Sequence, residues 1–339
     1  MANLPLWTPV ASLLLALAWL IPNGAPPWYA FHKDAWLALI LWVVALVWML
    51  KHRGLPRPFL LDPLSALLGM LALLAAAQWQ MGIVFFSGHA AVGVGYFLAA
   101  SVCVVLGRAW EQYEPGAVGS FLFLALLVAA MGTSGLMLAQ WLRVDVNETW
   151  VNYLPPWGRP FGNLLQPNNA ATLLLLGMVS LAWYAIQGRL GKWIGSAAAA
   201  YLLFFVALSG SRIGYLAFVS LAICAIGCSY RYAALRPWRT LSVLLLVLLP
   251  MFIFVVSHEW ATIEVASGSK PMQRDLANAR LLLYPAYLQA AFAEPWLGYG
   301  FEQGAKTQLA AAALGHELPG LFTWSHNAFL DIATWFGIP

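Results

Sequence analysis

Nine apolar runs separated by shorter polar segments occupy the first 256 residues of the chain. A helix that spans a membrane needs about 20 predominantly apolar residues. We therefore expect one spanning helix in each of the runs Leu6–Ile21, Ala35–Leu50, Leu64–Trp79, Ala90–Leu106, Val118–Trp141, Ala170–Ile186, Trp193–Leu208, Ile213–Cys228 and Leu241–Val256. A tenth apolar run begins at about His326 and is cut off at Pro339. The pattern predicts an all-α integral membrane protein, a polytopic helical bundle with about nine full spans and a truncated tenth.

A polar interval from Glu259 to Phe329 separates the ninth run from the tenth. Within it, apolar residues recur at three- and four-residue steps over Gln273–Phe292, which predicts an amphipathic helix that Pro285 kinks or divides. The apolar run Leu309–Leu314 is too short to span, so we expect it to lie on the membrane or to pack against the bundle.

We expect one integral domain with three parts. Residues 1–256 form the transmembrane scaffold, residues 257–325 form a large outer loop with amphipathic helices, and residues 326–339 begin a further span.

Composition supports the membrane assignment and excludes a soluble protein. The chain is 62% hydrophobic and 9% charged, whereas a soluble domain carries about 25% charged residues. Membrane lipid is therefore the expected solvent, and the 18 tryptophans suit the headgroup boundary. No Lys/Arg-rich run with interleaved aromatic residues suggests nucleic acid. The cysteines Cys103, Cys224 and Cys228 lie in apolar runs, and we interpret them as small buried hydrophobic residues.

The distribution of Lys and Arg among the loops predicts orientation, because cytoplasmic loops carry the excess of positive charge. With the N-terminus inside, the inner loops contain Lys51, Arg53, Arg57, Arg108, Arg189, Lys192, Arg231, Arg236 and Arg239, and the outer ones only Lys33, Arg143 and Arg159. The first run lacks a basic segment before it, so we expect a retained span. This bias predicts a bacterial inner-membrane protein whose segments 141–169, 209–212 and 259–329 face the periplasm.

The outer segment 141–169 is rich in glycine, proline and side-chain amides. A plain turn does not need so many amides, so we predict that Gln166 and Asn168 bind a substrate. Arg159 is either a further binding residue or a brace for this loop. In a purely structural interpretation, Asn168 or the asparagine after it caps the helix that begins at Ala170.

Two arginines on the expected outer face are candidates for catalysis. Arg212 follows a Ser-Gly-Ser sequence at the end of a span, where a guanidinium costs about 2.5–3.5 kcal/mol unless it reaches the interface. The small residues before it, Ser211 among them, let a ligand approach closely. Arg280 shares a helix face with Tyr284, one turn later, and its alternative role is that of an ordinary surface arginine.

His326 and Asn327 lie at the mouth of the last apolar run. An imidazole titrates near physiological pH and suits proton transfer, although a lone interfacial histidine is more often structural. The acidic residues are scattered without an Asp-x-Asp pair, so we expect neither a bound metal nor a metal-dependent nucleotide-sugar transferase.

Arginines that bind phosphate oxygens without a metal suit a donor in which a glycan is linked to a lipid diphosphate. Negative charge builds on the diphosphate as the glycosyl bond breaks, and fixed cations stabilise it. A histidine accepts the proton of the attacking hydroxyl. One displacement at the anomeric carbon inverts its configuration, and no cofactor is required.

Four motifs in order resemble the bacterial O-antigen ligase superfamily and, within it, the pilin-type protein O-oligosaccharyltransferases. They are residues 158–168 of the glycine- and amide-rich loop, Ser209-Gly210-Ser211-Arg212 at a span end, Arg280 followed by Pro295-Trp296-Leu297-Gly298-Tyr299-Gly300, and Ser325-His326-Asn327. The resemblance extends from about Pro22 to the end of the chain. Leu164-Leu165 stands where the subgroup usually has a glycine.

The resemblance implies a GT-C-like helical fold and an undecaprenyl-diphosphate-linked glycan as donor. It implies Arg212 and Arg280 on the donor diphosphate and His326 as base or acceptor-orienting group. The acceptor is a serine or threonine hydroxyl of a pilin-like protein in one subgroup and a lipid A core sugar in the other. Because the family continues with further spans, we expect part of acceptor recognition to lie beyond Pro339.

Two alternatives stay open. An O-antigen ligase acting on lipid A core, or an O-antigen polymerase, shares the donor chemistry. A lipid or polysaccharide transporter would use the arginines as a binding patch. Transporters often contain inverted repeats and broken helices at mid-membrane, whereas this sequence shows no repeat and its polar residues gather at one face.

Overall fold

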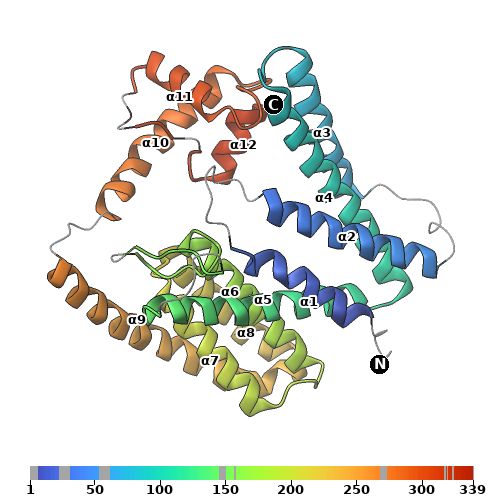
Figure 1. Cartoon of the computed structure of the whole chain (residues 1–339), viewed down its shortest axis with the longest axis vertical. Helices are drawn as coiled ribbons and strands as arrows, with labels where there is room; N and C mark the ends of the chain where they lie inside the picture. Colours follow the sequence, from blue (N-terminus) through green and yellow to red (C-terminus); the bar gives the residue numbers. More distant parts are fainter. Residues whose placement is uncertain are drawn as a thin grey trace. The chain divides into compact units, whose positions relative to one another are not determined.

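The computed structural model describes residues 7–22, 31–52, 62–144, 150–155, 158–267, 273–316, 318, 320–322 and 324–338, without the side chains of residues 31, 234, 259–267 and 273–280. Every regular element in these ranges is a helix (Figure 1). The predicted all-α class is therefore confirmed for this part of the chain.

The helices follow the apolar runs closely. In chain order they are α1 (Trp7–Leu20), α2 (Phe31–Lys51), α3 (Pro63–Gln80), α4 (Ser87–Tyr113), α5 (Ala117–Trp141), α6 (Pro167–Ile186), α7 (Lys192–Leu208), α8 (Arg212–Arg231), η1 (Ala233–Trp238), α9 (Arg239–Ser267), α10 (Gln273–Ala293), α11 (Gly304–Ala313) and α12 (Ala328–Phe336). Helices α4 and α9 continue well past their apolar runs, because a helix satisfies its own backbone hydrogen bonds in water as in lipid.

Seven described helices, α2 to α6, α8 and α9, are long and apolar enough to cross a membrane. Helices α1 and α7 are shorter, with 14 and 17 residues. The expected helix positions are thus confirmed, whereas the count of nine full spans stays a prediction. The expected tenth run forms the nine-residue helix α12, which begins at Ala328 and not at His326.

Two local expectations were wrong, those for the start of α6 and for the cysteines. Helix α6 begins at Pro167 and not at Ala170, because proline is favoured at the first helical position, so Asn168 lies inside the first turn and does not cap it. Helix α10 continues through Pro285 without a division, so of the two predicted outcomes the kink stays a prediction. The cysteines are exposed in the isolated chain and not buried, since they lie on outward faces of α4 and α8.

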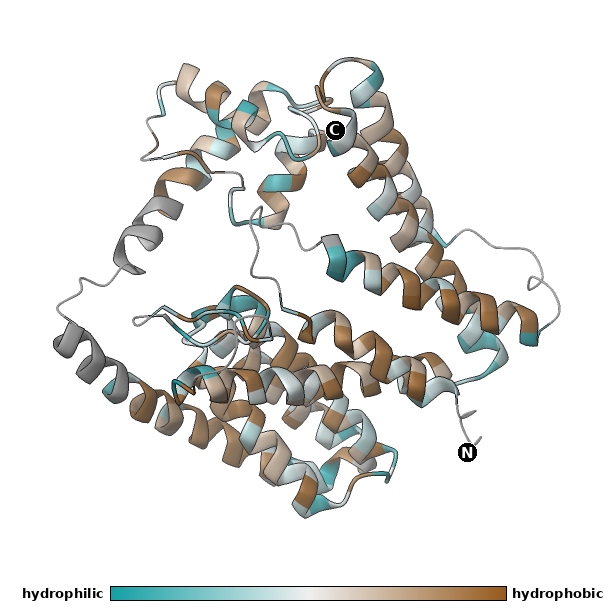
Figure 2. Ribbon diagram, in the orientation of Figure 1, coloured by the Kyte–Doolittle hydropathy of each residue, from teal (hydrophilic) through white to brown (hydrophobic). Residues whose placement is uncertain are grey.

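Large apolar side chains cover the outer faces of the helices. Trp42, Leu73, Phe254 and Trp193 are 69%, 72%, 74% and 90% exposed, and apolar residues follow α2, α5 and α9 along most of their lengths (Figure 2). Such surfaces are rare on soluble proteins. They are the faces that lipid would contact.

The chain forms two compact units, each built from segments far apart in the sequence. The first unit contains residues 1–54 and 110–269, and the second contains residues 55–109 and 270–339. This grouping does not coincide with the expected boundaries at residues 256 and 325, because α3 and most of α4 pack in the same unit as the segment after Lys270.

The core of the first unit lies among α5, α6 and α7, with α1, α8 and α9 packed around them. Leu174 on α6 and Leu202 on α7 are fully buried. Gly177 of α6 lies directly against Ala130 of α5, leaving no room for a β-carbon. Small residues at such contacts let helices approach closely in membranes.

A charged cluster holds one end of the first unit. Lys51 forms an ion pair with Glu114, Trp110 Nε1 donates to Glu114 Oε2 (3.1 Å), and His52 Nε2 lies 3.2 Å from Glu114 Oε1. Burial alone would raise the pKa of the Glu114 carboxyl, but these hydrogen bonds and the charge of Lys51 lower it. Helix α5 starts beside this cluster and runs 25 residues to the other end, about 37 Å away.

In the second unit, α3 pairs with α4, and α10 packs against α11 and α12. Leu283, Ala286 and Ala290 of α10 are fully buried, which confirms that part of the predicted apolar stripe. The hydroxyl of Tyr287 donates to Phe322 O (3.2 Å), and burial, with a smaller contribution from the charge of Asp331, raises the pKa of Tyr287 to about 12. The apolar run predicted at 309–314 lies largely within α11, which packs on α10.

Candidate active site

The turn between α7 and α8 is held by its serines. Ser209 Oγ donates to Val206 O (2.6 Å), and the Ser211 N–H donates to Ser209 Oγ (3.2 Å). Ser211 Oγ accepts from the Gly214 N–H (3.1 Å) and so caps α8. Both serines are buried, so the predicted binding residue Ser211 directs its hydroxyl into the cap.

Arg212 is the first residue of α8, and its side chain is exposed. Among the described residues it has no hydrogen-bond or ion-pair partner. A cation at this end opposes the helix dipole, which favours negative charge there. The position therefore costs some stability and leaves the guanidinium available for an anion.

Arg159 joins the glycine- and amide-rich loop to this turn. Its Nη1 donates to Gly210 O at 2.9 Å, two residues before Arg212. Gly210 has a φ of 61°, a conformation that suits glycine. Arg159 thus braces the α7–α8 turn, which is a different segment from the one that the sequence suggested.

Gln140, near the end of α5, forms hydrogen bonds to the backbone of the same loop. Its Nε2 donates to Asn152 O and Gly162 O (both 2.9 Å), and its Oε1 accepts from the N–H groups of Phe161 (3.0 Å) and Gly162 (2.8 Å). Gln140 is only 5% exposed. A buried amide that bonds both peptide groups of a turn fixes that turn firmly.

Asn163 and Lys33 complete this support. Asn163 is fully buried, and its amide donates to Leu20 O (2.6 Å) and Trp150 O (2.9 Å). Lys33 Nζ donates to Asn163 O (2.5 Å) from the start of α2. The lysine is only 8% exposed, and sequence inspection assigned it no role, because one cation among loop residues carries no signal.

The N-terminal turns of α6 and α8 lie against each other. A β-carbon on Gly214 would come within 2.8 Å of Ala171 Cβ, so only glycine allows this approach. Gln166, the N-cap residue of α6, is exposed and forms no side-chain capping bond, and Asn168 lies in the first turn. Arg159, Gln166, Asn168, Ser211 and Arg212 therefore lie at one end of the first unit. Two helix N-termini and a cation favour an anionic ligand there.

In the second unit, a tight turn presents His326. The Ser325 N–H donates to Asp331 Oδ1 (2.8 Å), Ser325 Oγ donates to Asn327 O (3.0 Å), and Asn327 Oδ1 accepts from the Phe329 N–H (3.1 Å), capping α12. Between the buried Ser325 and the half-buried Asn327, His326 is exposed with a φ of 60°. A non-glycine residue in the left-handed region is uncommon, and it persists only where the surrounding contacts hold it.

The glycine-rich motif 295–300 is a packing element. The Tyr299 N–H donates to Thr334 O (2.7 Å), and a β-carbon on Gly298 would lie 2.6 Å from that oxygen. Gln78 Nε2 donates to Leu297 O and Trp335 O (both 2.7 Å), and its Oε1 accepts from the Phe301 N–H. The motif therefore holds α12 against the end of α3.

Gln78 and Gln140 do the same work in the two units, and both stand in an Ala-Gln-Trp sequence at the end of an apolar helix. A glutamine before a tryptophan at the end of an apolar helix is the signal that could have identified them.

The remaining predicted residues lie in the second unit. Arg280 is in α10, four residues before the half-buried Tyr284, but its side chain lies outside the described part of the structure. The convergence of Arg212 with Arg280 and His326 stays a prediction. Within the described residues, no group of three or more His, Cys, Asp or Glu side chains is placed to hold a metal ion.

Comparison with known proteins gives two family matches and two curated relatives. Residues 197–339 match the O-antigen ligase family, and residues 160–184 match the protein glycosylation ligase family. A general O-oligosaccharyltransferase of Acinetobacter baylyi is 26% identical over 337 residues, covering 97% of this chain and 58% of the relative. A ComP-specific O-oligosaccharyltransferase of the same organism is 24% identical over 186 residues, covering 53% of this chain and 32% of the relative. The chain thus spans little more than half of the first relative's length, and no solved structure matches it.

Proposed function

The chain is related to the O-antigen ligase superfamily and, within it, to the protein O-oligosaccharyltransferases, and from this premise we propose that it transfers a preassembled glycan from undecaprenyl diphosphate to a serine or threonine hydroxyl of a pilin-like protein. Both curated relatives are named as O-oligosaccharyltransferases, one of them ComP-specific. Their names favour a protein acceptor over a lipid A core sugar.

The junction of α6 and α8 carries the proposal. Each helix N-terminus is equivalent to about half a positive charge, and the exposed guanidinium of Arg212 adds a full one at the same end. Arg159 and Gln140 immobilise the surrounding backbone. A diphosphate bound here would meet donors that are already oriented, and such donors stabilise developing charge most effectively.

In the proposed reaction, the acceptor oxygen attacks the anomeric carbon of the glycan. The bond from that carbon to the diphosphate oxygen breaks, and its electron pair stays on the leaving diphosphate, where Arg212 and Arg280 stabilise the charge. The hydroxyl proton passes to the imidazole of His326. A single displacement inverts the anomeric configuration, and the step requires neither a metal nor a cofactor.

We place this reaction on the periplasmic side of the inner membrane. The positive charges of the expected inner loops support that orientation. The loop 158–166 and the turn 209–211, both expected outside, lie at one end of the first unit, and Lys51, expected inside, lies at the other.

Transfer from the lipid-linked donor to a pilin-like acceptor, by the full-length protein in vesicles with chelator, tests the proposal. Removing one hydrogen-bond donor that stabilises transition-state charge lowers the rate by a factor of about 10²–10³. Arg212→Ala is therefore expected to lower kcat by that factor. Arg189→Ala is the matched control, because Arg189 is exposed in the connection between α6 and α7. Full activity of Arg212→Ala or of His326→Ala would contradict the mechanism.

A strain that lacks the gene distinguishes a protein acceptor from a lipid A core acceptor. Mass spectrometry of pilin-like proteins and of lipid A core should find the glycan missing from the protein and unchanged on the lipid. The O-antigen ligase match over 197–339 makes the ligase the second candidate, and loss of surface lipopolysaccharide with intact protein glycans would establish it. Movement of labelled donor across vesicles without any transfer would instead indicate a transporter.

A further inference from the structure

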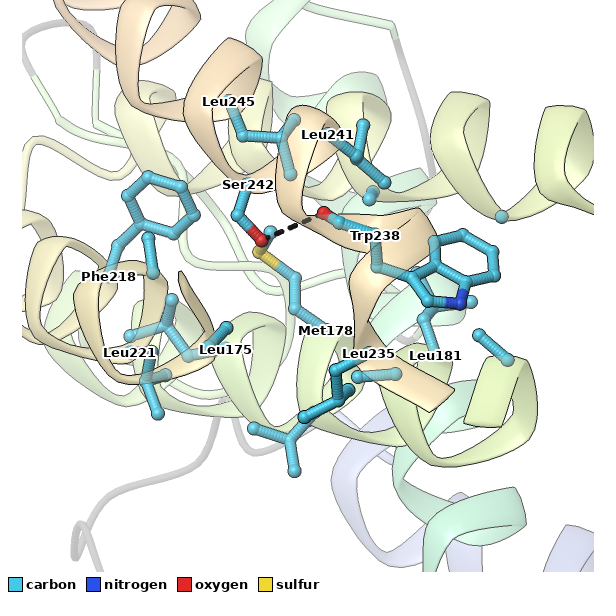
Figure 3. A pocket seen from close by; sticks show the side chains of 17 residues that line it. Leu175, Met178, Leu181, Phe218, Leu221, Leu235, Trp238, Leu241, Ser242 and Leu245 are labelled. Atoms are coloured by element: carbon cyan, nitrogen blue, oxygen red, sulfur yellow. Dashed lines mark hydrogen bonds between the residues drawn. The ribbon is translucent and has the colours of Figure 1, made fainter. Parts of the chain in front are cut away.

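An apolar cavity of about 230 Å³, partly open to the outer face, lies in the first unit among α6, α7, α8, η1 and α9 (Figure 3). Its walls include Leu175 and Met178 of α6, Phe218 of α8 and Leu245 of α9. The Ser242 hydroxyl at its edge donates to Trp238 O (3.2 Å) and is therefore already satisfied. None of the described residues that line the cavity is charged, so its chemistry suits a hydrocarbon.

The cavity exists because several lining positions carry very small side chains, namely Ala182, Ala185, Gly195, Ala199, Ala222 and Ala225. Protein interiors are normally packed with few voids larger than a water molecule. An apolar cavity of about 150 Å³ stays dry and takes up a ligand the size of benzene, so this one has room for more. Leu221 in its wall is 41% exposed, so the wall reaches the outer face of the unit, which lipid would contact.

The cavity lies on the same two helices as the candidate anion site. On α8 it extends from Phe218 to Ala225, about 9–20 Å along the helix from Arg212. On α6 it extends from Leu175 to Ala185, about 12–27 Å from the start of that helix. A ligand whose diphosphate rests at the two N-termini would extend its lipid chain along this pair of helices into the cavity.

We infer that this cavity binds the middle of the isoprenoid chain of the donor lipid. The inference rests on the proposed function, and it adds a second recognition site for the same substrate. The position of the cavity on the same two helices as the anion site favours the donor chain over the acyl chain of a bulk phospholipid. The cavity would hold the lipid anchor in place while the glycan leaves.

Filling the cavity tests the inference through the length of the donor's tail. Ala182→Leu and Ala225→Leu are the test variants, and Ala197→Leu on an exposed position of α7 outside the lining is the control. Transfer is measured with an undecaprenyl diphosphate donor and with a matched donor of two isoprene units. We expect KM for the long donor to rise about tenfold in the test variants, from the loss of roughly two buried methylene contacts. KM for the short donor should stay unchanged. Equal KM values for wild type and test variants with the long donor would overturn the inference.

A measurement on the wild-type protein guards against misfolded variants. An undecaprenyl diphosphate probe with a photoreactive diazirine in a middle isoprene unit should attach to peptides within 175–185 and 218–225, and excess unlabelled donor should abolish the labelling. Labelling elsewhere, or labelling by a diazirine phospholipid that excess donor does not displace, would overturn the inference. Labelling requires no glycan transfer. A wild-type protein that transfers no glycan would therefore count against the proposed function, whereas the labelling pattern would still show whether the cavity binds the isoprenoid chain.

Discussion

The substitution Gln140→Met examines how the candidate site is held in place. Methionine matches glutamine in length and volume, so the change removes hydrogen bonds without opening a cavity. Gln140 satisfies two carbonyl groups and two N–H groups of residues 152–162. All four lose their partner in the variant.

The expected loss follows from the burial of these groups. A buried polar group left without a partner costs about 1–3 kcal/mol. Gly162 and Asn152 are buried, whereas Phe161 is half-buried and water can reach its backbone. We therefore expect the loop to lose about 2 kcal/mol or more of local stability, which corresponds to at least ~30-fold faster opening.

Hydrogen exchange followed by mass spectrometry measures this directly. The amides of Phe161 and Gly162 are the reporters, because both donate to Gln140 Oε1. Their exchange should accelerate at least ~30-fold, and kcat for transfer should fall because Arg159 lies in the same loop. Gln187→Met is the control, since Gln187 is half-buried at the other end of α6. Unchanged exchange at both reporters in Gln140→Met would refute the reasoning.

Three further predictions concern other parts of the molecule. Gly298→Ala should lower the melting temperature, because its β-carbon would lie 2.6 Å from a backbone oxygen of α12. Gly315 also has a positive φ but open space around it, so Gly315→Ala should cost about 1–2 kcal/mol of stability from the backbone alone. Equal losses of stability in the two variants would contradict the packing role of Gly298. Burial raises the pKa of the Glu302 carboxyl, and the facing His89 opposes this shift only partly. The folded state therefore holds the carboxyl proton more tightly than the unfolded state does. Stability should fall as pH rises from the ordinary pKa of 4.5 to the raised pKa. The melting temperature of Glu302→Gln should not fall with pH over this range. A fall equal to that of wild type would contradict the role assigned to Glu302. Lys33→Met leaves the carbonyl of the buried Asn163 without its donor, which costs about 1–3 kcal/mol, so the melting temperature should fall, and kcat for transfer should fall because the loop that contains Arg159 loses support. An unchanged melting temperature would count against this supporting role of Lys33.

Helix positions and the distribution of charge could be predicted from the sequence alone. Lipid offers no hydrogen bonds, so each long apolar run must satisfy its own backbone, and a helix is the local solution. The errors lie at the ends, as at Pro167 and Ser267, where lipid no longer imposes the boundary. The grouping of residues 158–168 with Ser211-Arg212 was also predictable, because positive charge in the loops places both segments on one face.

What the tertiary structure decided is how those segments are held together. Gln78, Gln140 and Lys33 each bond to backbone atoms of segments distant in sequence, and a carbonyl or N–H group looks the same in every residue. No residue type marks the partner, so such contacts depend on the folded path of the chain. The cavity among α6 to α9 arises in the same way, because alanines and glycines are common in membrane helices, and only packing determines where their small side chains face one another.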